Sequence, residues 1–476
     1  MNNVLKSFLF FLFLTLNTYA ANSDNSFDNK NILFNNDVEH DVNYIEEPDL
    51  QAPNNNLILS KTGLNLIDIL NLALKNNPKV RESWTNVDTS KYSYRAELSN
   101  FLPTIKGELS YDRNKIKYRD SDTSTDKTKT MTPSVTLSYL LFDFGGREAD
   151  VLNFKYKLKA VGYETNDYIQ SFIYDVINAY YTLFSAVANE SAAREIENSS
   201  YEAYKAASLR YKIGLVPLTD KLQAKTSYMQ KRLNREKLEN TTKIDKANLT
   251  YLLNISPTDK VELSIPGLRI KENLIQENIN DLIKLALENR QDLKKYYETQ
   301  KAKKAELYSA RVDRLPSISF KGTYSHLNDL EENSNNDRNL YNIGVTATMP
   351  FFTGGYIYNN VAQTKSELKA VNYQIEDLKK SIEVDVWTAY QNFLTAERTH
   401  KTSEALLQSA SETAKNILGK YKNGKSSILD LLSAQSDLAS ARYDFIESQH
   451  NWFINRSDLL RSVGKMNLDE LKNLDK

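Results

Sequence analysis

Residues that could do chemistry are few and scattered in this chain of 476 residues. Cysteine is absent, which removes disulfides, thiol catalysis and cysteine metal ligands. The four histidines, His40, His326, His400 and His450, include no pair at metal-ligand spacing, and surface positions are expected for all of them. No nucleophile–base pair or phosphate-binding loop accompanies them. The sequence therefore predicts no enzyme, no metal and no cofactor.

Composition narrows the class of protein further. Lys plus Arg and Asp plus Glu are both 61, so net charge gives no attraction to nucleic acid. Gly and Pro number only 14 and 10, so turns are rare and a few very long elements are expected. No stretch after the first residues reaches the roughly 18 apolar residues of a membrane-spanning helix.

The two ends of the chain lie outside its main pattern. Residues 1–20 resemble a secretory signal peptide, with Lys6, the apolar run Phe8–Leu16 and a small-residue junction at Ala20. A retained anchor helix is the alternative interpretation. Residues 21–60 are rich in Asn and Asp and predict an acidic, disordered arm, and residues 465–476 form a tail. The mature protein is therefore expected outside the cytoplasm.

The chain contains the same unit twice, at residues 61–265 and 266–464. Matching segments recur at an offset of about 210 residues. They are Pro103-Thr104-Ile105 with Pro316-Ser317-Ile318, Leu141–Gly146 with Pro350–Gly355, and Tyr211–Gly214 with Tyr421–Gly424. Chance would not keep one offset over so many positions, so the two halves are expected to share one fold.

Each repeat contains two segments in which apolar and polar residues alternate. The predicted strands cover about 103–112, 131–142, 316–325 and 341–352, each with one apolar face. Their length fits membrane β-strands of roughly 9–11 residues. Polar loops are expected between them, at 112–129 and 326–339. A soluble hairpin packed on a core is the alternative.

Closure of such a sheet requires more than one copy of the chain. Strand edges cannot stay open in hydrocarbon, so membrane strands must form a closed barrel. Four strands are too few, since the smallest such barrels have about eight. The chain is therefore expected to share a barrel with copies of itself. Lys106, Glu108 and Lys321 on the polar face favour a wet interior.

Two very long helices complete the pattern. No proline interrupts residues 147–213 or 356–423, which predicts helices of about 67 residues, or roughly 100 Å. Coiled-coil spacing runs through both, in Phe172, Val176, Ala179, Leu183 and Ala186, and again in Ile382, Val386, Ala389, Phe393 and Ala396. Shorter helices at 78–100, 217–254, 292–314 and 426–464 are expected to stack end to end beside them. Either a hollow tube or a bundle with a dry centre satisfies this periodicity.

With these elements in place, the chain resembles the TolC family of outer-membrane export ducts over residues 60–464. The most specific segments are Tyr211–Asp220, Tyr421–Gly424 with Ile428-Leu429-Asp430, Ala441–Asp444 and Arg461–Gly464. The resemblance implies an α+β membrane protein. Three copies share a twelve-stranded β-barrel, four strands each, continued by a long α-helical coiled-coil tunnel. It also implies a location in the outer membrane of a Gram-negative bacterium, in contact with outer-membrane lipid, with a large periplasmic part.

The resemblance also implies partners and places for their contacts. A periplasmic adaptor and an inner-membrane pump of the RND, ABC or MFS type would dock and open the tunnel. Gly214 and Gly424 are expected to be left-handed C-caps, with Pro217 first in the next helix. The turns they form are the candidate adaptor contacts, namely Gly214, Leu215, Val216, Gly424, Lys425 and Ser426.

Two aspartates begin the returning helices and carry the gate hypothesis. An acid in a first helical turn offsets the positive helix end, and Ser427 with Asp430 fits a cap. By resemblance, Asp430 forms a carboxylate ring at the periplasmic constriction, and Asp220 with Thr219 and Tyr421 matches a hydrogen-bonded latch. The chain departs from the family's best-known member at Ser426 and Gln449, which replace latch arginines, and at Ser433, which replaces a second ring aspartate. Lys425 is one candidate for a substitute latch pair.

The function expected from this resemblance is a passive exit duct of a tripartite export system, for drugs and other small molecules or for secreted proteins. The sequence does not separate these two uses. The alternative is a soluble periplasmic coiled-coil scaffold or adaptor without a pore.

Overall fold

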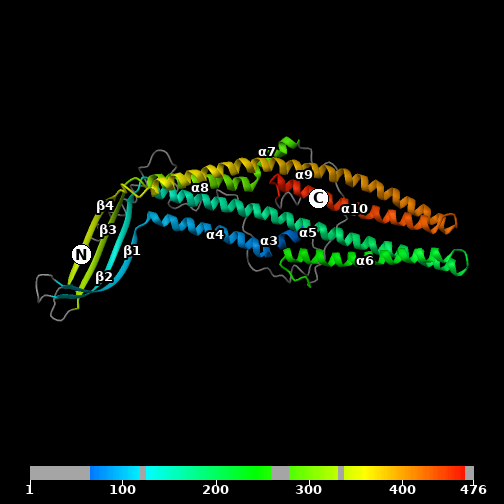
Figure 1. Ribbon diagram of the computed structural model, residues 1–476, viewed down its shortest axis with the longest axis horizontal. Coiled ribbons are helices and arrows are strands. Elements are labelled where there is room, and N and C mark those ends of the chain that lie inside the picture. Colours follow the sequence, from blue (N-terminus) through cyan, green and yellow to red (C-terminus); the bar gives the residue numbers. More distant parts are fainter. Residues whose placement is uncertain (1–64, 118–124, 259–277, 331–336, 467–476) are drawn as a thin grey trace. The chain divides into compact units, whose positions relative to one another are not determined.

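The computed structural model describes residues 65–117, 125–258, 278–330 and 337–466. The predicted signal peptide, acidic arm, His40 and nearly all of the C-terminal tail lie outside these residues. The first repeat contains α3 (Leu66–Asn76), α4 (Pro78–Leu98), η3 (Ser99–Phe101), β1 (Thr104–Lys117), β2 (Thr125–Phe142), α5 (Gly146–Lys212) and α6 (Leu218–Leu252). The second contains α7 (Ile279–Asn289), α8 (Gln291–Val312), β3 (Ser317–Asp329), β4 (Arg338–Thr348), α9 (Tyr356–Lys422) and α10 (Ile428–Ser462). The element order of the first repeat thus returns in the second (Figure 1).

The chain divides into two compact units. The sheet unit is built from Ser90–Lys159 and Lys301–Leu368, and contains all four strands with the adjoining helix ends. The hairpin unit contains Ala160–Gln300 and most of α9 and α10. No helix of the described residues combines the length and apolar character needed to cross a membrane.

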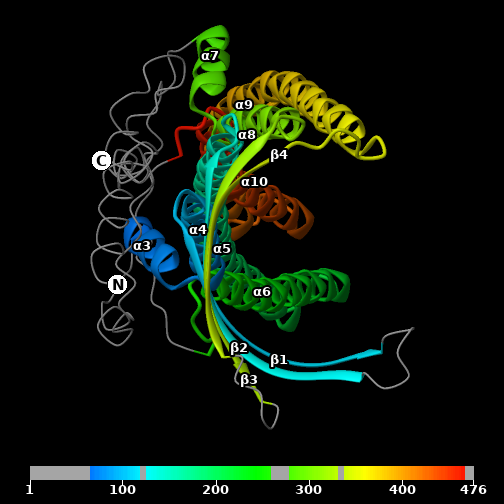
Figure 2. The same ribbon diagram turned by 90° about the vertical axis from the view of Figure 1, so that its left-hand side faces the viewer.

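The four strands form one antiparallel sheet in the order β1-β2-β3-β4. Figure 2 shows this sheet as a strongly curved ribbon. Alternation places Ile105, Leu137 and Gly322 in one cross-strand row on the apolar face. On the opposite face the hydroxyls of Thr136 and Thr323 lie 3.1 Å apart. Within the described residues β1 and β4 are paired on one side only, so each leaves an open edge.

The strands differ from their predicted bounds at the loop ends. β1 and β2 continue to the pair Lys117–Thr125, well inside the segment expected to be a polar loop. Polar residues pair there because ladder bonds use backbone groups, whatever the side chain. β3 likewise runs on to Asp329, and β4 ends at Thr348 instead of 352. The early end of β4 follows from Pro350, which has no N–H to donate.

At the junctions between the strands and the long helices, one of the predicted motif matches is wrong by one residue. Phe144 and Gly145 have φ of +56° and +85°, and their structural counterparts are Gly354 and Gly355, with φ of +62° and +84°. Gly145-Gly146 therefore does not align with Gly354-Gly355, because Gly146 already begins α5. The carbonyl of Phe144 accepts a bond from Tyr308 at 3.2 Å, which helps to hold this non-glycine residue in the left-handed region.

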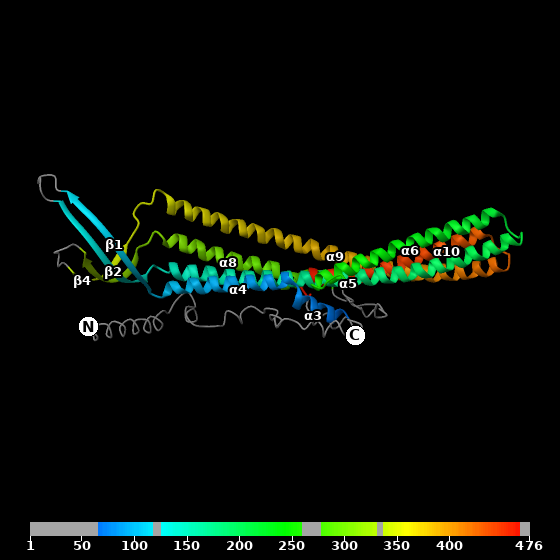
Figure 3. The ribbon, with the colours of Figure 1, turned by 90° about the horizontal axis from the view of Figure 1, so that it is seen from below.

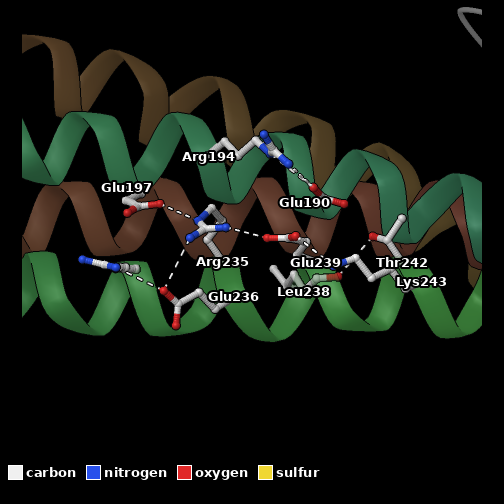
Figure 4. A network of polar contacts seen from close by, with 10 residues as sticks. Glu190, Arg194, Glu197, Arg235, Glu236, Leu238, Glu239, Thr242 and Lys243 are labelled. Carbon is white, nitrogen blue, oxygen red and sulfur yellow. Dashed lines mark hydrogen bonds and ion pairs between the residues drawn. The ribbon is translucent and has the colours of Figure 1, made fainter.

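Helices α5 and α9 each span 67 residues. Nine of the ten coiled-coil positions are buried, including Val176 and Val386, both at 0 % exposure, while Ala179 is partly exposed. In the hairpin of α5 and α6, Arg235 lies between Glu197 of α5 and Glu239 of its own helix, with both ion pairs at 2.7 Å (Figure 4). These side chains are partly buried, and the pair with Glu197 helps to set the registration of α6 on α5.

The short helices stack end to end, as expected from their lengths. At the end of α6, Asn254 donates to the carbonyl of Asn76 at 3.3 Å, and Asn77 donates to Leu252 at 3.1 Å. The end of α10 meets the α7–α8 junction in the same way. There Gly464 has φ of +75°, and a Cβ atom at this position would lie 3.0 Å from the backbone of Asn289 and Arg290.

Gly464→Val is expected to destabilise the fold by about 1–3 kcal/mol, because it combines a left-handed φ with a backbone collision. Thermal unfolding of the purified trimer in detergent measures the effect. Gly419→Ala is the matched control. A Cβ at this position in the interior of α9 meets nothing within 4 Å, so the control should stabilise the fold by about 0.5–1 kcal/mol. An unchanged melting temperature for Gly464→Val would contradict the packed joint.

Candidate functional site at the helix-hairpin tips

The two hairpin turns have the same backbone geometry. In the first turn Gly214 has φ of +77°, and the N–H of Leu215 donates to the carbonyl of Arg210 at 2.9 Å. The second turn repeats this cap, with φ of +70° at Gly424 and a bond from Lys425 at 2.9 Å. Both are Schellman caps, which satisfy carbonyls at a helix end. The left-handed caps predicted for both glycines are therefore present.

Side chains around the turns are open to solvent. A Cβ added at Gly214 or Gly424 would meet nothing within 4 Å. Leu215 is 70 % exposed, Lys425 is exposed, and Val216 and Ser426 are partly exposed. The residues predicted to contact an adaptor thus lie at the ends of the two hairpins (Figure 3).

The returning helices begin one residue later than expected in the first repeat. Pro217 is the N-cap of α6, not its first helical residue, because its ψ of 163° is extended. Ser427 holds the same position in α10. Asp220 and Asp430 are consequently both third residues of their helices, which places them in equivalent positions.

A small core joins all four helices at the tip. It consists of alanines from α5 and α6, which let the backbones approach closely, and larger side chains from α9 and α10. Its buried members are Ala203, Ala207, Ala224, Tyr421, Ile428 and Leu431. The two hairpins of one chain are therefore packed against each other just behind their turns.

Arg210 fastens this core from the side of α5. Its guanidinium donates to the carbonyls of Tyr421 at 2.8 Å and Lys422 at 3.2 Å. It also lies over the Tyr421 ring, 4.4 Å from the ring centroid. Two carbonyls at the end of α9 thus accept from a cation of the other repeat, in addition to the bond that the Tyr421 carbonyl accepts from the N–H of Gly424 at 3.0 Å. The sequence analysis missed Arg210, although it directly precedes the matched Tyr211 segment.

Of the residues in the predicted latch, Tyr421 is the one that lies in the buried core at the tip. It is 4 % exposed. Burial raises the pKa of its phenol, the Asp220 carboxylate acts in the same direction, and Arg210 opposes both. Thr219 is exposed and Asp220 is partly exposed. Among the described residues, no side-chain hydrogen bond joins either of them to Tyr421.

Asp430 is exposed, and its carboxylate closes a capping box. Oδ2 accepts from the N–H of Ser427 at 2.9 Å and from the hydroxyl of Ser426 at 2.9 Å, while the Asp430 N–H donates to Ser427 Oγ at 3.1 Å. These bonds, led by the backbone N–H of Ser427, lower the pKa of Asp430. The carboxylate is therefore charged at neutral pH. Ser426, where the resemblance would have a latch arginine, acts here as a donor to the aspartate.

Two of the described histidines are partly buried, so the expected surface positions are wrong for them. His400 Nδ1 lies 3.1 Å from Ser448 Oγ, which links α9 to α10, and burial lowers the pKa of His400. His450 Nε2 lies 3.2 Å from Thr182 Oγ1, which links α10 to α5. Both are partly buried structural residues. In the described part of the chain no three acidic or histidine side chains are grouped closely enough to hold a metal ion.

Comparison with known proteins shows to which family this chain belongs. The family model for outer membrane efflux proteins matches residues 69–254 and 282–465, one region in each repeat. The chain belongs to the outer membrane efflux protein family. Similar relatives include TolC of Escherichia coli, 21 % identical over 86 % of this chain and 83 % of TolC, and BepC of Brucella suis, 23 % identical over 84 % of this chain and 85 % of BepC. The CmeC outer membrane channel of Campylobacter jejuni has a TM-score of 0.75 at 20 % identity, covering 86 % of this chain and 89 % of CmeC.

Membership of this family confirms the predicted fold class, location and export function. The chain is an outer-membrane channel protein whose copies assemble as trimers, with a large periplasmic helical part, and it works with adaptor and pump partners. The hollow tube is thereby favoured over a dry bundle, and a channel over a soluble scaffold without a pore. The family is one of transport channels, in agreement with the absence of catalytic groupings in the sequence.

Arg210→Gln should loosen the tip, because it removes the charged donor to the α9 carbonyls and the contact with the Tyr421 ring. A loss of about 1–2 kcal/mol is expected for a partly exposed bond of this kind. Hydrogen exchange of tip peptides, read by mass spectrometry, measures it. Arg232→Gln is the control, since Arg232 forms an exposed ion pair with Glu236 on its own helix at 3.1 Å. Equal protection in both variants would show that Arg210 does not hold the tip.

Proposed function

We propose that this chain is the outer-membrane exit duct of a tripartite export system, closed at rest where its two helix hairpins end. The observation that carries the proposal is the four-helix core at the tip, with Arg210 fastened to the end of α9. Hairpin ends that are capped and packed against each other support a passive conduit that is closed at this point. The chain itself supplies no energy for transport, so an inner-membrane pump of the RND, ABC or MFS type would supply it.

Asp430 is proposed to line the constriction of this gate. Three copies of an exposed, ionised carboxylate around one axis make a ring that attracts cations and repels anions. The capping box supports this role, since it holds the carboxylate in one place and lowers its pKa. Thr219, Asp220 and Tyr421 are proposed to hold the gate shut, with Arg210 added to the set. Arg210 supplies the cation that Ser426 and Gln449 do not.

Asp430→Asn should make purified trimers less cation-selective, since the ring loses its charge while the side chain keeps its size. Reversal potentials in a planar bilayer under a KCl gradient measure this. Glu236→Gln, on the exposed face of α6, is the control and should leave the potential unchanged. An identical reversal potential for Asp430→Asn and the unaltered protein would remove Asp430 from the constriction.

The pH dependence of cation selectivity provides a second test of the same proposal. The capping bonds lower the pKa of Asp430, so they should keep the carboxylate charged, and the channel cation-selective, to a lower pH than without them. Ser426→Ala removes one of the hydrogen bonds that lower this pKa. The variant should therefore lose selectivity at a higher pH than the unaltered channel. Coincident pH profiles would contradict the capping bonds as the cause.

The turns at Gly214 and Gly424 are proposed as the adaptor contacts. Gly214→Leu and Gly424→Leu should abolish export while trimers persist in the membrane, because a bulky side chain would occupy the contact surface. Gly214→Ala and Gly424→Ala are matched controls, which carry the same left-handed strain of about 1–2 kcal/mol with little added bulk. Whole-cell export measures the effect. Normal export by both leucine variants would defeat the assignment, and equal loss in the alanine variants would assign it to the caps.

A further inference from the structure

The helix-hairpin tips carry a strong positive charge in a chain whose net charge is zero. Residues 203–225 and 413–436, which include both turns, contain nine basic residues and two acids, Asp220 and Asp430. Six of these lysines are exposed and form no ion pair with a carboxylate in the part of the chain that the structure describes. They are here called the basic collar, and are Lys212, Lys225, Lys415, Lys420, Lys422 and Lys425.

Helix stability accounts for half of the collar. Cations in the last turns of α5 and α9 offset the negative helix ends, and these cations are Lys212, Lys420 and Lys422. Lys225 and Lys415 lie more than one turn from an end of their helices, where this effect has faded. Lys425 precedes Ser427, the N-cap of α10, and so lies at a positive helix end. These last three lysines do not stabilise the helices that carry them.

The subunit has no other evident use for this charge. A surface that only has to be soluble carries both signs interspersed. Lys425 is a candidate for a substitute latch pair by sequence, yet among the described residues of one chain it forms no ion pair. A surface field of one sign instead attracts a partner of the opposite sign and speeds its approach. The collar therefore indicates recognition of an acidic partner.

Apolar side chains are exposed at the same tips. Ile213 and Leu215 are 63 % and 70 % exposed at the first turn, and Leu429 is 59 % exposed at the second. Apolar groups inside a charged rim are typical of protein–protein interfaces, whereas a surface that binds phosphates needs no exposed leucine. A Cβ at Gly214 or Gly424 would meet nothing within 4 Å, so another backbone can approach closely. This combination favours a protein over a lipid or a nucleic acid.

We propose that the basic collar selects an adaptor whose docking end is acidic. The inference rests on the proposed adaptor contact at Gly214 and Gly424, and it adds the chemistry by which the partner is recognised. Aspartates and glutamates of the adaptor would lie over the collar, while its apolar side chains would cover Leu215 and Leu429. Charges at the rim of an interface act mainly on the association rate and its salt dependence. The collar should therefore determine how fast the adaptor binds at low salt.

Association of the purified trimer in detergent with the purified adaptor of the same bacterium tests the collar, measured by biolayer interferometry. Lys225→Gln, Lys415→Gln and Lys425→Gln combined remove the three charges that the helix ends do not need, so the fold should stay intact. At about 50 mM NaCl the association rate should fall about tenfold. At about 500 mM NaCl the difference should nearly disappear, because salt screens exposed charges.

Two matched variants control for effects other than charge at the tip. Arginine at the same three positions keeps the charge and should keep the association rate. Lys79→Gln, Lys284→Gln and Lys365→Gln combined remove three exposed lysines outside the tip, and should also leave the rate unchanged. An unchanged rate for the collar variant, or an equal loss in the variant outside the tip, would overturn the inference.

The proposed contact and its chemistry can fail separately. Adaptor binding that is lost in Gly214→Leu and Gly424→Leu but kept by the collar variant would leave the contact in place and remove the acidic partner. Binding kept by all of these variants would remove the contact as well. Vesicles of phosphatidylglycerol and phosphatidylethanolamine are the probe for lipid. Collar-dependent binding of trimers to such vesicles, with adaptor association unaffected, would assign the lysines to lipid instead.

Discussion

The structure depends on one constraint, that a β-sheet edge cannot remain unpaired in hydrocarbon. The residues that the structure describes in one copy form four strands and leave two edges, so the sheet is incomplete until other copies supply the missing neighbours. The internal repeat already contains one contact between strand pairs, because β2 of the first repeat pairs with β3 of the second.

The same duplication shapes the periplasmic end, with a different result. Both hairpins turn through the same left-handed cap, yet their surroundings have diverged. The first turn exposes leucine, while the second exposes lysine and closes a capping box with Asp430. The alanine-lined core and Arg210 hold these unlike tips together. Equivalent backbones thus carry different chemistry at the two turns.

Much of this was predictable from residue spacing. Repeats, alternating strands, helices of 67 residues and both glycine caps leave direct marks in the sequence, since each reflects a backbone rule. Three features could not be read there. The strands end where backbone pairing ends, and the polar side chains there give no sign of it. Phe144 takes a left-handed conformation that is usually restricted to glycine. Arg210 binds residues of the other repeat, about 210 positions away, and local patterns give no sign of such a contact.

The bond made by Arg210 has an evolutionary consequence. Its acceptors are main-chain oxygens, which every amino acid carries, so the anchorage does not depend on the identity of Lys422. The exposed side chains of the second turn can therefore change without removing these bonds. A fastening of this kind separates the stability of the tip from the chemistry that its surface displays.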